Sequence, residues 1–170
     1  RRPPRDRIPR GGTVTRSAGL LPYRRATDGQ LEVFIAHMGG PFWARKDERA
    51  WSVVKGEVDA GEGDEDTARR EFAEEIGTDA PPGPWADLGE VRQKSGKVVH
   101  AFAVCAPELA FVASTEVEVE WPRGSGRRVR FPEVDRAEWM SLRAARPRLV
   151  AGQVAFLDRL VALAETAPST

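Results

Sequence analysis

The sequence contains a single cysteine, Cys105, among its 170 residues. One thiol excludes an intrachain disulfide framework and the usual thiolate zinc site. No apolar run approaches the ~18 residues that a membrane-spanning helix needs, so we expect no membrane partner. The 26 basic and 26 acidic side chains cancel, so net charge indicates no affinity for nucleic acid or membranes. We therefore expect a soluble, cytoplasmic protein of one domain, the usual outcome for ~100–200 residues.

The balanced charge is unevenly distributed. Residues 1–16 hold six arginines and one acid, mixed with proline and glycine. This composition predicts a flexible basic arm, followed by a folded domain over residues 17–166. Residues 56–79 hold ten acids against only Arg69 and Arg70. Carboxylates at that density repel one another, and a fold tolerates them best where cations bind.

The pattern of apolar residues predicts an α+β fold. Strands are expected near residues 17–23, 31–38, 51–54, 87–93, 97–106 and 138–140, and the first two pair as a hairpin. Glu116, Glu118 and Glu120 alternate with apolar residues and so share one face of a further strand. Helices are expected over 64–76, with Asp64 as N-cap and Gly77 at the C-terminus, and over 153–165. Together, these strands and helices predict an α/β/α sandwich around a mixed β-sheet.

The acidic helix carries the predicted chemistry. Glu71, Glu74 and Glu75 lie at i, i+3 and i+4, so their carboxylates share one helix face. Magnesium prefers carboxylate oxygens together with water and substrate phosphates. Glu62, in the preceding loop, either adds a ligand or holds Arg70. An exposed acidic face without a metal is the alternative interpretation.

The spacing in this region matches a known pattern. Gly56, Glu62, Arg70, Glu71, Phe72, Glu74, Glu75 and Gly77 fit G-x5-E-x7-R-E-U-x-E-E-x-G, where U is a bulky apolar residue. This resembles the signature of the Nudix hydrolases, magnesium enzymes that cleave nucleoside diphosphates linked to another group. The preceding WSVVKGEVDAGE is similar to the family's approach to the motif. Val54 stands where proline is usual, and Thr78 replaces a bulky apolar residue.

The resemblance implies roles for individual residues. Glu71, Glu74 and Glu75 resemble the family's ligands for Mg²⁺, for which Mn²⁺ substitutes, and water is the nucleophile at phosphorus. Glu62 and the Gly56 carbonyl are implied auxiliary ligands, and Arg70 is implied to orient the glutamates. Glu75 is the first choice as general base, with Glu118 or Glu120 as the second. Lys55 either contacts phosphate or is solvated.

Substrate contacts are predicted outside the motif. Phe42 and Trp43 lie in a polar, glycine-containing loop and are candidates for stacking on a base. The side chains of Trp51, Trp85 and Trp121 are further candidates, with burial in the core as the alternative. Cations that suit a polyphosphate are Arg45, Lys46, Arg123, Arg127 and Arg128. His37 and His100 fall in strands and are expected to be hydrogen-bonded rather than catalytic.

The resemblance extends to a bacterial subgroup of nucleoside-triphosphate pyrophosphohydrolases near the diadenosine polyphosphate hydrolases. It implies a nucleoside tri- or polyphosphate substrate, such as diadenosine tetraphosphate, and a monomer or homodimer. An RNA 5′-end pyrophosphohydrolase and a non-catalytic nucleotide-binding module are the alternatives, and nucleic acid is the less favoured partner. A prenyl diphosphate isomerase would need a reactive Cys105, whereas the apolar strand around that residue predicts inert packing.

Overall fold

The computed structural model describes residues 14–166. A seven-stranded sheet has the order β3-β2-β1-β6-β5, with β4 paired to β1 and β9 paired to β2. The strand bounds are β1 Arg16–Arg25, β2 Leu31–Met38, β3 Trp51–Ser52, β4 Val54–Glu57, β5 Ala86–Arg92, β6 Val98–Cys105, β7 Glu116–Glu120, β8 Arg128–Pro132 and β9 Val134–Ser141. The helices are α1 Asp64–Ile76, α2 Leu142–Arg148, η1 Ala151–Gln153 and α3 Ala155–Thr166. Strands β1 and β6 are parallel and the other pairs antiparallel, so the sheet is mixed, as expected.

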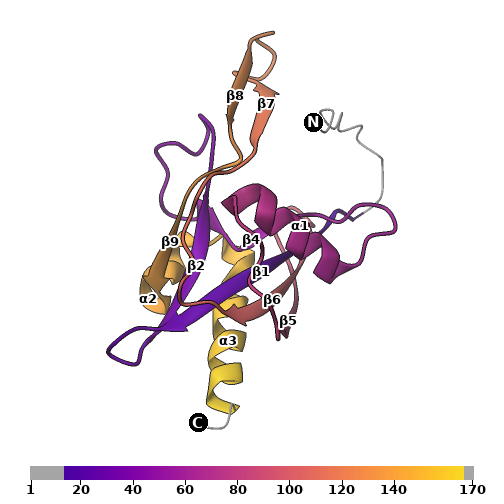
Figure 1. Ribbon diagram of the computed structural model, residues 1–170. Coiled ribbons are helices and arrows are strands. Elements are labelled where there is room, and N and C mark those ends of the chain that lie inside the picture. Colours follow the sequence, from indigo (N-terminus) through magenta and orange to yellow (C-terminus); the bar gives the residue numbers. More distant parts are fainter. Residues whose placement is uncertain (1–13, 167–170) are drawn as a thin grey trace.

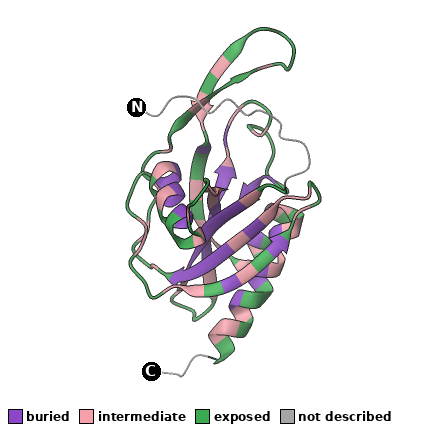
Figure 2. Cartoon of the chain, turned by 90° about the vertical axis from the view of Figure 1, so that its right-hand side faces the viewer, coloured by how far each residue is buried: buried purple, intermediate pink, exposed green. Residues whose placement is uncertain are grey.

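Helices cover both faces of the sheet (Figure 1). In β1, Leu20 packs in the core beneath α1, while its neighbour Leu21 packs in a second core with α3. Phe34 and Ile35 divide in the same way along β2. Successive strand residues point to opposite faces, so α1 and α3 lie on opposite sides. Figure 2 shows the resulting buried central strands. The α/β/α sandwich predicted from the sequence is confirmed.

Several element boundaries differ from the sequence prediction. The helix predicted over 64–76 is α1, but its N-cap is Gly63, and Asp64 is the first helical residue. The Asp64 carboxylate instead accepts hydrogen bonds from Arg16 and His100, which draw it away from the helix end. Helix α2 was not predicted, because its seven residues include Pro147. Most of the predicted arm, residues 1–13, lies outside the described residues, whereas Arg16 is the first residue of β1.

A two-stranded hairpin, β7–β8, stands away from the sheet at the top of Figure 1. Val117 pairs with Phe131 and Val119 with Val129, so these apolar residues share one face. The glutamates of β7 share the other face with the arginines of β8, as the alternation predicts. Among the described helices, none is long and apolar enough to cross a membrane.

Candidate active site

Two glutamates lie on the buried face of α1. The side chains of Ala68, Phe72 and Ile76 anchor the helix in the core beneath it. Glu71 and Glu75 follow the same face one turn apart, and each is only 6% exposed. The apolar anchors therefore hold two carboxylates between the helix and the sheet.

A third carboxylate reaches them from another part of the chain. One carboxylate oxygen each from Glu71, Glu75 and Glu133 lie within 4.8 Å of one another. Glu133 lies between β8 and β9, at the base of the hairpin. Its backbone N–H donates to the Thr115 carbonyl at 3.0 Å, and its own carbonyl accepts from Gly39 at 3.0 Å. We name Glu71, Glu75 and Glu133 the carboxylate cluster.

Burial and mutual repulsion change the acidity of the carboxylate cluster. Burial raises the pKa of Glu75 well above its ordinary value, the charge of Glu133 raises it further, and Lys55 opposes the shift. Burial likewise raises the pKa of Glu71, against the hydrogen bond from Arg70. A cation among the three carboxylates would offset both effects. The donors are all carboxylate oxygens, and part of the cluster is open to solvent through Glu133, which fits Mg²⁺.

Arg70 connects Glu71 to the preceding loop. Its Nη1 donates to Glu71 at 2.5 Å, while Nε and Nη2 donate to the two oxygens of Glu62 at 2.9 and 2.8 Å. The hydrogen bonds from Arg70 and Thr67 lower the pKa of Glu62 to about 2, against its burial. Glu62 therefore holds Arg70 and lies outside the carboxylate cluster. Glu74 is half-buried, with Oε1 3.6 Å from Arg70 Nη1.

Strand β4 packs directly against the carboxylate cluster. The Glu71 carboxyl group lies over Gly56, where a Cβ atom would overlap it. The backbone N–H of Lys55 donates to Glu75 Oε2 at 3.2 Å. The motif glycine and the residue before it thus shape the site through the backbone, which the spacing alone does not reveal.

The predicted substrate residues fall into two groups. The exposed loop between β2 and β3 carries Phe42, Trp43, Arg45 and Lys46, and the turn of the hairpin carries Arg127. Trp121, at the end of β7, contacts Phe42 with ring centroids 6.2 Å apart. By contrast, Trp51 is 2% exposed and belongs to the core, and the partly buried Trp85 packs against the core at Phe102.

Three residues singled out in the sequence lie away from the carboxylate cluster. Glu118 and Glu120 are not in the carboxylate cluster, because they lie on the hairpin, where Glu118 pairs with Arg130. The carboxylate from the C-terminal half of the chain that does join the carboxylate cluster is Glu133. It lies directly after β8, and no periodicity or motif spacing in the sequence distinguishes it. Cys105 is exposed at the end of β6, so the prediction that its side chain is packed was wrong, while its expected lack of reactivity stays a prediction.

Both histidines are hydrogen-bonded, as predicted. His37 is fully buried and lies 2.8 Å from Asp135 Oδ1 and 2.6 Å from the Lys46 carbonyl. His100 lies between the carboxylates of Asp64 and Asp87, at 2.6 and 2.7 Å. Both residues connect separate elements of the fold.

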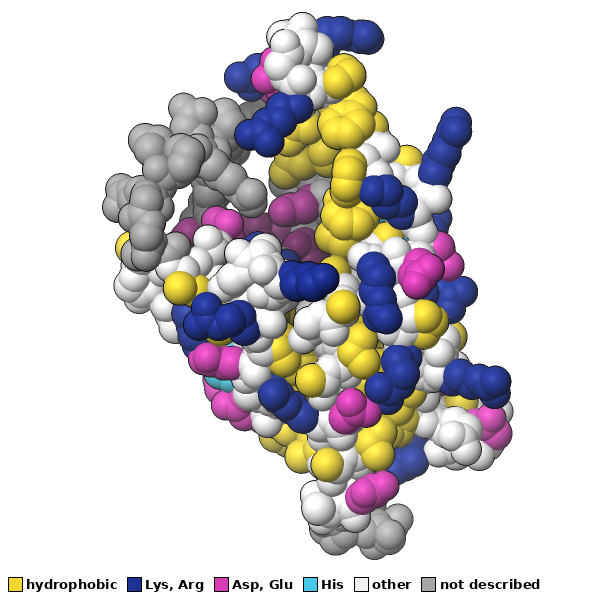
Figure 3. All heavy atoms as spheres, turned by 180° about the vertical axis from the view of Figure 1, so that it is seen from behind, with side chains coloured by type: hydrophobic (Ala, Val, Ile, Leu, Met, Phe, Trp, Pro, Cys, Tyr) yellow, Lys and Arg dark blue, Asp and Glu magenta, His cyan; other side chains and the backbone are white. Residues whose placement is uncertain are grey.

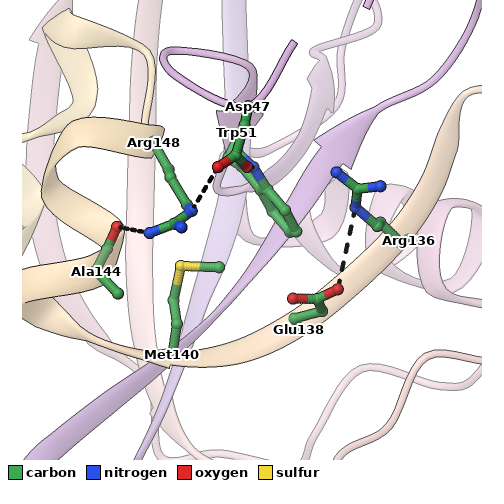
Figure 4. A pocket seen from close by; sticks show the side chains of 7 residues that line it. All are labelled: Asp47, Trp51, Arg136, Glu138, Met140, Ala144 and Arg148. Atoms are coloured by element: carbon green, nitrogen blue, oxygen red, sulfur yellow. Dashed lines mark hydrogen bonds and ion pairs between the residues drawn. The ribbon is translucent and has the colours of Figure 1, made fainter. Parts of the chain in front are cut away.

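A hollow lined by Trp51 lies on the side of the sheet that packs against α3 (Figure 4). Its volume is about 250 Å³, and it is lined by Asp47, Trp51, Arg136, Glu138, Met140, Ala144 and Arg148. Arg148 Nε donates to Asp47 at 3.1 Å, and Arg136 lies 4.0 Å from Glu138. The charges in this hollow are therefore compensated within it. Trp51 belongs to the core on the α3 side, so the hollow is separate from the carboxylate cluster.

Residues 15–160 match a family model described as NUDIX domain. Among solved structures, a Caenorhabditis elegans Ap4A hydrolase binary complex is similar at TM-score 0.63 and 20% identity, covering 91% of this chain and 100% of that one. The NUDIX domain of Shewanella oneidensis NrtR complexed with ADP ribose is similar at TM-score 0.58 and 14% identity, covering 90% of each chain. The Escherichia coli ORF135 protein is similar at TM-score 0.57 and 19% identity, covering 92% and 95%. No curated protein sequence matches significantly.

Proposed function

The chain belongs to the Nudix family of pyrophosphohydrolases, and we propose that it hydrolyses a pyrophosphate bond in a nucleoside tri- or polyphosphate or a dinucleoside polyphosphate, with magnesium as its cation. The observation that carries this proposal is the carboxylate cluster, whose oxygens lie within 4.8 Å of one another. Manganese as a substitute cation and a cytoplasmic location belong to the same proposal.

We assign the cation to Glu71 and Glu75, with Glu74 at the rim and the Gly56 carbonyl as further donors. Magnesium bound there would neutralise the negative charge of the substrate phosphates and lower the pKa of a water molecule at the site. Arg70 fixes the orientation of Glu71 through its hydrogen bond, and Glu62 fixes Arg70. These contacts hold the carboxylates in place before substrate arrives, so less reorganisation is needed during reaction.

The general base in this proposal is Glu133, with Glu75 as the alternative. Glu133 is exposed, whereas Glu75 is buried beneath it in the carboxylate cluster. A proton taken from water by an exposed carboxylate passes readily to solvent, so Glu133 suits repeated proton transfer. It replaces Glu118 and Glu120, which lie on the hairpin.

The substrate class draws on charge and on structural relatives. We assign contacts with the substrate phosphates to Lys55, Arg45, Lys46 and Arg127. We assign stacking on a base to Phe42 and Trp43. An Ap4A hydrolase and an ADP-ribose complex are among the similar structures. The same fold also fits a nucleotide-binding module without turnover, so the test must measure binding and hydrolysis separately.

The test is product analysis with magnesium over nucleoside triphosphates, diadenosine polyphosphates, ADP-ribose, NADH and 5′-triphosphorylated RNA. Binding of each compound is measured beside it, and Glu75→Gln is the inactive variant. Magnesium-dependent cleavage that this variant reduces at least ~100-fold would support the proposal. Binding without cleavage of any compound would overturn it in favour of the binding module, and selective cleavage of RNA would favour the 5′-end enzyme.

A further inference from the structure

One buried side chain joins two segments of the candidate active site. His37 lies near the end of β2 and is fully buried. Its Nδ1 lies 2.8 Å from Asp135 Oδ1 in β9, and its Nε2 lies 2.6 Å from the Lys46 carbonyl in the loop between β2 and β3. A buried polar group costs free energy unless it is hydrogen-bonded, so both contacts stabilise the position of the imidazole. The Trp51 ring packs edge-on against it, with ring centroids 5.2 Å apart.

Asp135 lies at an irregularity in the pairing of β2 with β9. The register places His37 opposite Arg136. It places the next residue, Met38, opposite Val134, so β9 contains one additional residue, Asp135. Such a bulge interrupts the ladder and redirects the residues next to it. The His37 ring contacts the carboxylate of this additional residue, and it therefore fixes the conformation of the bulge.

The bulge lies two residues after Glu133. Gly39, two residues after His37, donates its backbone N–H to the Glu133 carbonyl at 3.0 Å. A Cβ atom at Gly39 would overlap the Pro132 carbonyl, so the end of β2 is in close contact with this segment. The contacts of β2 with residues 132–135 thus set the backbone from which the Glu133 side chain extends into the carboxylate cluster.

The space-filling view shows where this segment leads. In Figure 3, which shows the molecule from behind, acidic side chains gather in a recess below the top of the molecule. The hairpin is at the top in this view as in Figure 1, because the two views differ by a turn about the vertical axis. The recess therefore lies at the base of the hairpin, where Glu133 follows β8.

The second hydrogen bond of His37 holds the loop between β2 and β3, residues 39–50, which we name the substrate loop. Lys46 N–H donates to the Trp43 carbonyl at 2.9 Å, so the carbonyl that His37 contacts belongs to a turn. At the end of the substrate loop, Trp51 Nε1 donates to Asp47 Oδ1 at 2.8 Å. The substrate loop carries several of the side chains to which the proposed function assigns substrate contacts.

We propose that His37 is a positioning residue, which holds the general base Glu133 and the substrate loop in a fixed relation to each other. The inference rests on the proposed function and adds to it a residue that is too deeply buried to touch substrate. His37 acts on Glu133 through Asp135, and on the substrate loop through the Lys46 carbonyl. Because the two hydrogen bonds are separate, their effects on kcat and KM can be measured separately.

A double-mutant cycle tests the link to Glu133. The Asp135 side chain is 31% exposed, so its replacement disturbs the core less than that of His37. Asp135→Ala should lower kcat about tenfold or more, because a small displacement of a catalytic group is costly. Asp135→Asn keeps an acceptor oxygen and should stay within about threefold of the parent.

The same substitution should have little effect once the general base is absent. In the Glu133→Gln background, Asp135→Ala should lower the remaining rate less than about twofold. A loss of folded protein would instead lower both rates by the same factor. Single-turnover hydrolysis with magnesium, of the compound that the parent cleaves fastest, measures each protein.

His37→Phe tests the link to the substrate loop. Phenylalanine keeps a ring against Trp51 but offers neither nitrogen. This variant should raise KM at least about threefold as well as lower kcat. Asp135→Ala keeps the contact with the Lys46 carbonyl, so its KM should stay within about twofold. Chemical denaturation verifies that each variant is folded under the assay conditions, and the Asp135 cycle decides the inference if His37→Phe does not fold.

His100→Gln is the control, because His100 also contacts two acceptors but lies outside the carboxylate cluster. Its kcat and KM should stay within about twofold of the parent. Equal losses from Asp135→Ala in both backgrounds, or no recovery of kcat in Asp135→Asn, would overturn the inference and leave the proposed function standing. An unchanged KM in folded His37→Phe would overturn the link to the substrate loop. A parent that hydrolyses none of the compounds would overturn the proposed function, and the positioning role with it.

Discussion

The carboxyl group of Glu71 rests directly on the Cα of Gly56, so the motif glycine and the motif glutamate occupy complementary space. Any Cβ atom at position 56 would overlap that carboxyl group. Gly56→Ala should therefore displace Glu71 from the carboxylate cluster and lower kcat at least about tenfold. Overpacking should also cost ~1–3 kcal/mol of unfolding free energy. Steady-state kinetics over a magnesium titration and chemical denaturation measure the two effects.

Gly63→Ala is the matched control for this substitution. A Cβ at position 63 meets only Asp66 Oδ2, at 3.7 Å, and the backbone there has an ordinary φ of −76°. Its activity should stay within about twofold of the parent. If Gly56→Ala keeps parental kinetics and magnesium affinity, the close fit between Gly56 and Glu71 has no role in the site.

Glu133 and Glu118 form a second matched pair. Glu133 belongs to the carboxylate cluster, while Glu118 lies on the hairpin opposite Arg130. Because a general base contributes 10²–10⁴-fold, Glu133→Gln should lower kcat by about 100-fold or more. Glu118→Gln should stay within about twofold. Single-turnover hydrolysis checks both, and a loss confined to Glu118→Gln would return the role to the hairpin.

His100 should make stability depend on pH. Burial lowers its pKa, but the hydrogen bonds that its ring donates to the Asp64 and Asp87 carboxylates outweigh that effect and raise the pKa above the usual 6.5. A raised pKa contributes stability that is fully present below about pH 6.5 and is lost as pH rises through the folded value. Arg16 and Glu90 complete the charged groups around it. His100→Gln should cost ~1 kcal/mol at pH 6 and less at pH 9.

Denaturant unfolding at several pH values measures this effect. The parent should lose free energy of unfolding relative to His100→Gln as pH rises. A constant difference between the two proteins from pH 6 to 9 would contradict a charged imidazole at this position.

Cys105 offers a test between reaction classes. The thiol is exposed at the end of β6 and lies outside the carboxylate cluster. Cys105→Ala should leave hydrolysis within about twofold of the parent and change stability by no more than ~0.5 kcal/mol. Complete loss of turnover, with the fold intact by circular dichroism, would instead indicate a nucleophilic thiol and an isomerase-type reaction.

Local patterns in the sequence are enough to predict the helix over 64–76 and the placement of Glu71 and Glu75 on one of its faces. Helical periodicity is a local property, so residues one turn apart share a face wherever the helix packs. The strand over 31–38 was equally readable, because its apolar run is buried on both faces of the sheet.

The other groups that meet this helix face are brought there by the packing of distant segments. Glu133 reaches the carboxylate cluster because β8 ends and β9 begins beside β2 and α1, and no local pattern in the sequence encodes that approach. The exposure of Cys105 likewise depends on where β6 ends rather than on its apolar neighbours. Phe42 and Trp121 come from different segments and meet only because the hairpin stands over the loop after β2. Spacing determines what one element presents, whereas contacts between distant segments depend on how the elements pack.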